Sequence, residues 1–169
     1  MKKVLLILFV LAILILAMPQ GVLADNAPRN VEIKAVYGTA TDFNAVRNPL
    51  FPNPWTLSAL NSPNQVDNGI MFTLTTQSPT WTVTATSTGT PEGFMTGDQG
   101  VNLASSFLVH STKTSNYVTP KAGVIIKDGG PSNTNQNWNE NVQQPIISTD
   151  PGSSIPWTIT ITFTCAAGF

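Results

Sequence analysis

The sequence predicts an all-β protein, an antiparallel β-sandwich of about seven to nine short strands. Three observations support this class. Apolar residues recur at every second position along most of the chain, which is the period of a strand with one buried face. Turn signals such as Asp67-Asn68-Gly69 and Asp150-Pro151-Gly152 interrupt these runs at short intervals. No window carries a convincing apolar stripe at the helical period.

Four segments alternate most clearly and are expected to form strands with well-defined buried faces. They are residues 30–37, 70–76, 80–86 and 157–165. In the last of these, threonine occupies every outward position from Thr158 to Thr164. The residues expected to point into the core from these segments are Val31, Ile33, Ala35, Tyr37, Phe72, Leu74, Trp81, Val83, Ala85, Trp157, Ile159, Ile161, Phe163 and Cys165.

Weaker alternation predicts the remaining strands. These are residues 55–60, 107–111, 117–119 with 124–127, and 142–147. Residues 132–141 are rich in asparagine and are expected to form a long loop. The number of strands and the spacing of the turns favour an immunoglobulin-like (Ig-like) arrangement.

The first 24 residues have the features of a secretory signal peptide. Lys2 and Lys3 precede an unbroken apolar run over residues 4–18, and Val22 and Ala24 supply small residues before Asp25. The run is shorter than the roughly 20 residues that a membrane-spanning helix needs, although a retained N-terminal anchor is the alternative. We therefore expect residues 1–24 to be a signal peptide and residues 25–169 to form a single β-sandwich domain.

The charge composition excludes several classes of partner. Only 10% of the 169 residues are charged, against roughly 25% in an average protein. Residues 25–169 hold six Lys and Arg against nine Asp and Glu, a net charge of −3. There is no basic surface for nucleic acid, and we expect no stable membrane insertion after processing. Neutral side chains carry the polarity instead, with 22 Thr, 15 Asn and 12 Ser.

Few residues are suited to catalysis, and we expect no enzyme activity and no cofactor. His110 could act as a general base, but no carboxylate lies near it in the sequence, which favours a surface or edge-strand histidine. Cys165 lies on the apolar side of its predicted strand, which favours a small core residue, with an intermolecular disulfide as the alternative.

The aspartates do not predict a metal site. Asp67, Asp98, Asp128 and Asp150 all lie within two residues of a Gly or Pro, where aspartate commonly bonds to the backbone of its own turn. A calcium site would require several of these turns to converge, and the acidic spacing of an EF-hand loop is missing.

Among the four tryptophans, Trp138 is the one expected to be exposed. Trp81 and Trp157 share the phase of inward apolar residues, whereas Trp138 lies within the Asn-rich segment. If an aromatic residue binds a ligand, Trp138 is the best candidate, with Asn137 and Asn139 beside it. The alternative is a loop tryptophan folded over a sheet edge.

The order of segments resembles a group of secreted β-sandwich proteins from archaeal and bacterial surfaces. The resemblance covers residues 80–164 and is carried by Trp81-Thr-Val-Thr-Ala85, Gly93-Phe-Met-Thr96, Gln143-Gln-Pro145 and residues 157–164. The first and last of these also resemble the WxL cell-surface domain, although Val83 and Ile159 stand where that motif has leucine. The resemblance implies a surface or matrix protein, and the WxL likeness implies non-covalent attachment to the cell wall.

Together these features predict a secreted, non-enzymatic surface protein. The first hypothesis is a structural subunit of a fimbria, sheath or matrix that associates with copies of itself, because uncharged strand faces do not repel one another. The alternative is a module that binds cell-wall glycan without a covalent link. Its partners would accordingly be itself or a cell-wall polymer.

The expected signal peptide predicts where the mature protein begins. We expect the mature protein to begin at Asp25, because Val22 and Ala24 occupy the small-residue positions before it. N-terminal sequencing of protein recovered from the cell surface tests this. A sequence that starts at Met1 or Lys2 would instead indicate a retained anchor.

Overall fold

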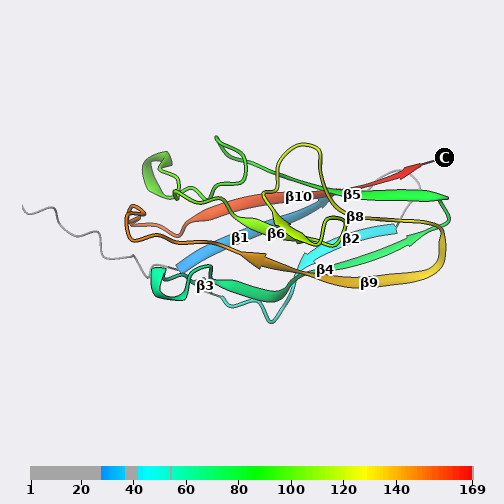
Figure 1. Ribbon diagram of the computed structural model, residues 1–169, viewed down its shortest axis with the longest axis horizontal. Coiled ribbons are helices and arrows are strands. Elements are labelled where there is room, and N and C mark those ends of the chain that lie inside the picture. The colour runs from blue at the N-terminus through cyan, green and yellow to red at the C-terminus, as the bar shows by residue number, and fades with distance from the viewer. Residues whose placement is uncertain (1–27, 37–41, 54, 169) are drawn as a thin grey trace, which may run out of the picture.

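The chain folds into two five-stranded β-sheets that pack face to face around one core (Figure 1). The computed structural model describes residues 28–36, 42–53 and 55–168, so the predicted signal peptide lies outside the described residues. The strands are β1 (Pro28–Val36), β2 (Asp42–Arg47), β3 (Trp55–Thr56), β4 (Gln65–Thr76), β5 (Thr80–Ser87), β6 (Leu108–Ser111), β7 (Asn116–Val118), β8 (Val124–Gly129), β9 (Ser132–Gln143) and β10 (Thr158–Gly168). Two short 3₁₀ helices, η1 (Ala59–Asn61) and η2 (Asp98–Gly100), lie in connections. The all-β prediction is confirmed.

The first sheet has the order β3-β1-β10-β5-β8, and the second has the order β2-β4-β9-β6-β7. Every strand pair is antiparallel except β1 with β10, which run parallel side by side (Figure 1). The parallel pair joins the first and last strands, with Asn30 opposite Thr158 and Val36 opposite Thr164.

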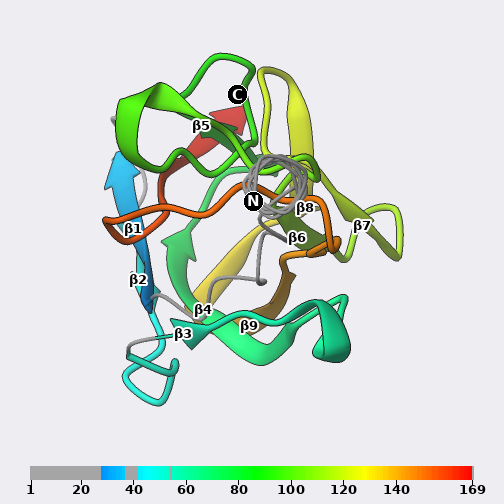
Figure 2. The ribbon, with the colours of Figure 1, turned by 90° about the vertical axis from the view of Figure 1, so that its left-hand side faces the viewer.

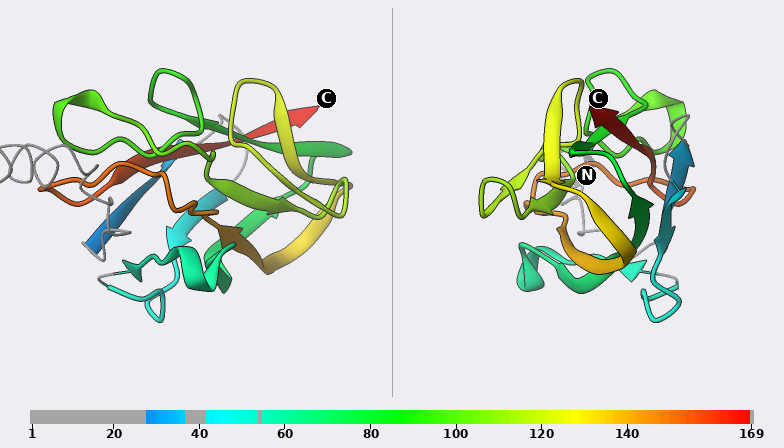
Figure 3. Two further views of the ribbon diagram at one scale, coloured as in Figure 1. Left: turned by 60° about the vertical axis from the view of Figure 1, so that its left-hand side comes forward. Right: turned by 90° about the vertical axis from the view of Figure 1, so that its right-hand side faces the viewer.

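The two sheets come together along both sides of the molecule. β1 contacts β2 on one side, and β6 contacts β8 on the other (Figure 2). The second contact is a polar seam, in which the Ser111 hydroxyl donates to the carbonyls of Ile125 and Ile126. Lys113 adds a main-chain bond to Ile126 and an ion pair with Asp128. An end-on view shows how these contacts nearly enclose the core (Figure 3, right).

The core lies between the sheets. It contains the predicted inward residues of the segments 70–76, 80–86 and 157–165, together with residues that were not predicted, such as Phe43, Met95 and Leu103. The predicted inward residues Phe72, Leu74, Trp81, Ile159, Ile161 and Phe163 are all buried. Phe72 from β4 meets Phe163 from β10 edge to face, with ring centroids 5.0 Å apart, and so links the two sheets. Cys165 is buried as predicted, and burial raises the pKa of its thiol to about 11.

The structure corrects five details of the sequence prediction. Residues 132–141 form most of β9, a central strand of the second sheet, and not a loop. Residues 42–47, within a Pro- and Asn-rich stretch, form the edge strand β2. The segment 55–60 is strand only at β3 and then turns into η1, and the segment 142–147 leaves the sheet after Gln143. The parallel β1–β10 pair also departs from a purely antiparallel sandwich.

Loops at two points are held by buried polar side chains. Asn64, 6% exposed, donates through its amide to the carbonyls of Ser58 and Gln144 and accepts from the Ser58 amide. Asp150, 4% exposed, accepts main-chain hydrogen bonds from Ala104 and Ile147. These bonds satisfy the polar groups that would otherwise be costly to bury.

Candidate functional site

The outer face of β2, β4 and β9 is a nearly uncharged polar surface. Cross-strand register places Asn44, Thr73 and Asn137 in one row and Val46, Met71 and Asn139 in the next. We call this surface the Asn–Thr face; it consists of Asp42, Asn44, Val46, Met71, Thr73, Thr75, Asn135, Asn137 and Asn139. Asp42 is the one charged residue among these nine.

The strand β9 separates the predicted ligand residues onto opposite faces. Asn137 and Asn139 are exposed on the Asn–Thr face, as their predicted role in binding requires. Trp138 points to the other side, because successive side chains of a strand alternate. The exposed loop position predicted for Trp138 is therefore wrong, and these three residues do not form one surface.

Trp138 lies at the border of the core. Its ring stacks on Phe72 at 5.1 Å and on Trp81 at 5.9 Å, which accounts for its half-buried state. The Lys127 ammonium from β8 lies 5.1 Å from the centre of the ring, in a cation–π arrangement. Trp138 thus links the two sheets and does not offer a flat, open platform.

A hollow of about 190 Å³ is open on the Asn–Thr face, over the end of β2. The side chains that line it are almost all polar, and Thr75 donates its hydroxyl hydrogen to Asn135 Oδ1 within it. Its lining residues are Asp42, Phe43, Asn44, Thr73, Thr75 and Asn135. This site was not predicted, because the residues of β2 and β9 were not expected to form strands.

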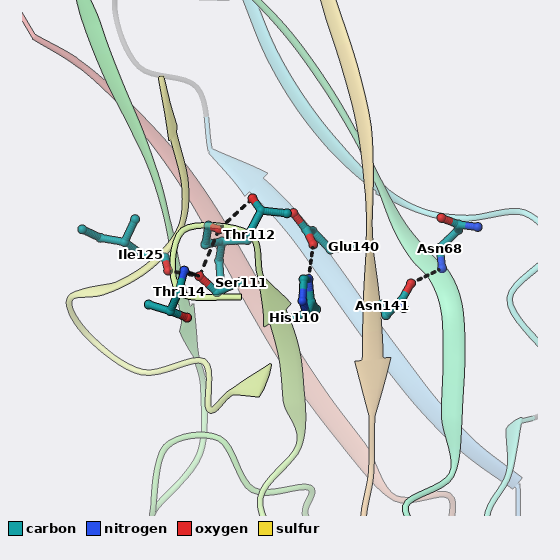
Figure 4. Close-up of polar contacts among 9 residues, drawn as sticks. Asn68, His110, Ser111, Thr112, Thr114, Ile125, Glu140 and Asn141 are labelled. Atoms are coloured by element: carbon teal, nitrogen blue, oxygen red, sulfur yellow. Dashed lines mark hydrogen bonds and ion pairs between the residues drawn. The ribbon is translucent and has the colours of Figure 1, made fainter. Parts of the chain in front are cut away.

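A second polar cluster lies beside the seam between the sheets. His110 Nδ1 and Glu140 Oε2 are 3.0 Å apart, and Figure 4 shows the two side chains pointing toward each other from β6 and β9. Glu140 is 1% exposed, whereas the His110 side chain is 30% exposed. The His110 ring also meets Tyr117 edge to face at 5.4 Å.

Burial dominates the electrostatics of Glu140. It raises the pKa of the carboxyl group above the ordinary value of 4.5, because a charged carboxylate is poorly solvated between the sheets. The hydrogen bond and charge of His110, the charge of Lys127 and the Thr112 hydroxyl oppose this shift. Within the described part of the chain, no hydrogen bond reaches the buried atoms Glu140 Oε1 and Trp138 Nε1.

The His110–Glu140 pair has the geometry of an oriented base but lacks a nucleophile. A carboxylate on Nδ1 fixes the histidine tautomer, as in a hydrolase triad. Among the described residues, however, no hydroxyl or thiol hydrogen bonds to His110. Its sequence neighbour Ser111 is fully buried, with its hydroxyl bonded to carbonyls of β8. The pair therefore fits a structural contact between β6 and β9.

The aspartates singled out in the sequence do not converge. Asp98 accepts hydrogen bonds from the backbone and side chain of Ser154, which lower the pKa of its carboxyl group. Asp128 pairs with Lys113, Asp67 accepts from Gln65, and Asp150 holds its own loop. Within the described ranges, no three His, Cys, Asp or Glu side chains are grouped as a metal site would require.

The outer face of the first sheet carries the threonine ladders. In the register of β10 with β5, Thr162 is opposite Thr86 and Thr164 is opposite Thr84. All four side chains are partly exposed. The Thr84 and Thr86 hydroxyls make long, 3.5 Å contacts with main-chain carbonyls of β10.

No protein-family model matches the sequence, and no curated protein matches it. In the part of the chain that is described, no helix has the length and apolar character to cross a membrane.

Proposed function

We propose that the chain is a secreted, non-enzymatic cell-surface structural protein with an Ig-like sandwich fold, which associates with copies of itself. The observation that carries this proposal is the paired threonine ladder of β5 and β10. Two adjacent central strands present threonines in register, and neither strand contains a charged residue.

Such a face favours stacking of copies for two physical reasons. The ladder threonines carry no charge and so do not repel those of another copy, and hydroxyl groups cost far less to remove from water than charged groups. Neither ladder strand contains a lysine or any other charged side chain that stacking would have to remove from water. Charged positions of the neighbouring strands flank the ladder in the register. Asp128 of β8, which pairs with Lys113, is opposite Thr82, and Lys34 of β1 is opposite Thr162.

Assembly through this face should tolerate salt and fail when a charge is introduced. We expect the mature protein to form oligomers or filaments whose size is unchanged between ~0.1 M and ~1 M salt, because no ion pair holds them together. Thr84→Lys should yield monomers, since each interface would bury an unpaired ammonium group. Light scattering after size exclusion and electron microscopy measure both effects.

The matched control is Asn139→Lys, which places the same charge on the outer face of the other sheet. We expect this variant to assemble like the wild type. A wild-type protein that stays monomeric would contradict self-association itself, whereas equal loss of assembly in both variants would contradict only the threonine face as its site.

A second route to assembly is exchange of the N-terminal strand. β1 joins its sheet through the parallel pairing with β10, and β3 covers only Pro28 and Arg29 along the other edge of β1. An identical β1 from a neighbouring copy would make the same main-chain hydrogen bonds. In the structure, β1 pairs within its own chain, which is the competing arrangement.

Disulfide cross-linking distinguishes pairing of β1 within its own chain from exchange of β1 between copies. Lys34 and Thr162 are direct neighbours in the parallel register. In a Cys165→Ala background, we expect a mixture of Lys34→Cys chains and Thr162→Cys chains, refolded together, to form a disulfide between chains if strands exchange. The control is one chain carrying both substitutions. A linked monomer from that chain, with no cross-linked mixture, would contradict exchange.

Deletion of residues 25–37 tests the same route independently. If strands exchange, we expect the shortened protein to be folded, monomeric and able to bind an added peptide of residues 25–37. Circular dichroism and size exclusion measure these properties. An unfolded product would support pairing within the chain, and native oligomers would contradict exchange at this end.

A further inference from the structure

We propose that the hollow on the Asn–Thr face is a binding site for one ring of a neutral sugar. The proposal goes beyond self-association and does not depend on it, because the threonine ladders lie on the other sheet. The hollow, of about 190 Å³, is smaller than the roughly 300–1,000 Å³ of sites for drug-sized ligands, which suits a ligand of single-ring size.

The chemistry of the lining matches vicinal hydroxyl groups. The Asp42 carboxylate accepts hydrogen bonds only, and the Asn44 and Asn135 amides both donate and accept. The Thr73 hydroxyl does either, whereas the Thr75 hydroxyl, which donates to Asn135, is left to accept. Each sugar hydroxyl also donates and accepts. Neighbouring hydroxyls on a ring can therefore be held by a carboxylate or an amide that faces both of them.

The same lining disfavours other ligands. Among the residues that the structure describes, no Lys, Arg or His lines the hollow to pair with a phosphate or carboxylate group, and Asp42 would repel such an anion. A single carboxylate is also too few for calcium, which takes six to eight oxygen ligands. A neutral polyhydroxylated molecule avoids both conflicts.

The strands hold these groups in place before a ligand arrives. Register sets Asp42 opposite Thr75 and Asn44 opposite Thr73. The hydrogen bond from Thr75 of β4 to Asn135 fixes a side chain of a third strand, β9. Beneath them, the Phe43 side chain is 1% exposed and stacks on Phe72 at 6.1 Å. Polar groups fixed on a rigid sheet lose little entropy on binding, which favours affinity.

Titration followed by amide NMR spectra tests the proposal directly. The probes are the methyl glycosides of glucose, mannose, galactose and N-acetylglucosamine, each added to ¹⁵N-labelled protein with residues 1–24 removed. We expect at least one to shift the amide signals of Asn44, Thr73, Thr75 and Asn135 in a saturable way. The signals of β5 and β10 should stay unchanged.

Substitutions on the exposed face provide the controls. Asp42→Asn and Asn44→Ala should each weaken binding by about five- to tenfold, since each removes a hydrogen-bonding group without touching the core. Asn139→Ala, which removes an exposed amide of the same face outside the hollow, should leave affinity unchanged. Dispersed spectra show whether each variant remains folded.

Three results would overturn the proposal. The first is the absence of saturable shifts with all four glycosides. The second is that inorganic phosphate or calcium chloride alone moves the same signals, which would indicate an ion site. The third is equal weakening by Asn139→Ala, which would indicate diffuse contact with the whole face. None of these results bears on oligomer size, so self-association is judged separately.

Discussion

Truncation of Phe163 to alanine is expected to lower the free energy of unfolding by about 3–5 kcal/mol. The side chain is fully buried on β10 and meets Phe72 of the opposite sheet edge to face. The substitution removes apolar area from the core and leaves a cavity where the two sheets are in contact. Urea unfolding followed by tryptophan fluorescence measures the change.

The matched control for Phe163→Ala is Leu60→Ala. Leu60 is 96% exposed in η1, so its truncation should change stability by less than about 0.5 kcal/mol. A loss below about 1 kcal/mol for Phe163→Ala would mean that β10 has the opposite face inward, because a shift by one residue inverts a strand. The buried position of Cys165 would then also be wrong.

The second large effect concerns the pH dependence of stability through Glu140. Burial raises the pKa of its carboxyl group in the folded protein above the ordinary value of 4.5, so the folded state holds this proton more tightly than the unfolded chain. Linkage then requires that the associated stability is fully present below the ordinary glutamate pKa and is lost as the pH rises through the raised folded pKa.

Glu140→Gln isolates this contribution, because glutamine has a similar shape and does not titrate. As the pH rises from the ordinary glutamate pKa, we expect the wild type to lose stability relative to the variant. The comparison consists of urea unfolding curves of both proteins at a series of pH values. Parallel pH profiles would show that Glu140 titrates alike in the folded and unfolded states.

The His110 partner adds a coupled effect at neutral pH. His110→Ala removes the hydrogen bond to Glu140 Oε2 and should cost about 1–3 kcal/mol, because a buried polar group loses its partner. In a Glu140→Gln background the same substitution should cost less. Equal costs in both backgrounds would mean that the two side chains contribute independently.

The sequence predicted the fold where apolar and polar residues alternate strictly. The Trp157–Cys165 alternation marks β10, and Trp81, Val83 and Ala85 mark β5, with core residues in the expected phase. Burial of every second side chain requires such a pattern, so it can be recognised without tertiary information. Which strands become neighbours depends on contacts distant in the sequence, and the parallel β1–β10 pair was not predicted.

The sequence of β9, which was not predicted as a strand, repeats at every second residue, but the repeated residue is asparagine. Asparagine occupies alternate positions from Asn133 to Asn141, and the residues between include Trp138 and Glu140. Because asparagine has low strand propensity, composition indicated a loop. The regular alternation was the signal that could have identified the strand, and with it the exposed positions of Asn137 and Asn139.

The candidate sites were harder to predict than the strands. Glu140 is 30 positions from His110 along the chain, and only the placement of β6 beside β9 brings them together. The hollow likewise needs β2, β4 and β9 in register. Sites built from three separated segments leave no local pattern in a single sequence.

The parallel pairing of β1 with β10 sets the order in which the chain can fold. β1 is synthesised long before its main pairing partner β10, so most of this edge stays unpaired until β10 has been made. Contacts so distant in sequence are slow to form, because a long loop must close before they are made. We therefore expect the first sheet to stay incomplete until β10 is available, which would suit a polypeptide that must pass through a narrow translocation channel on the proposed route of export.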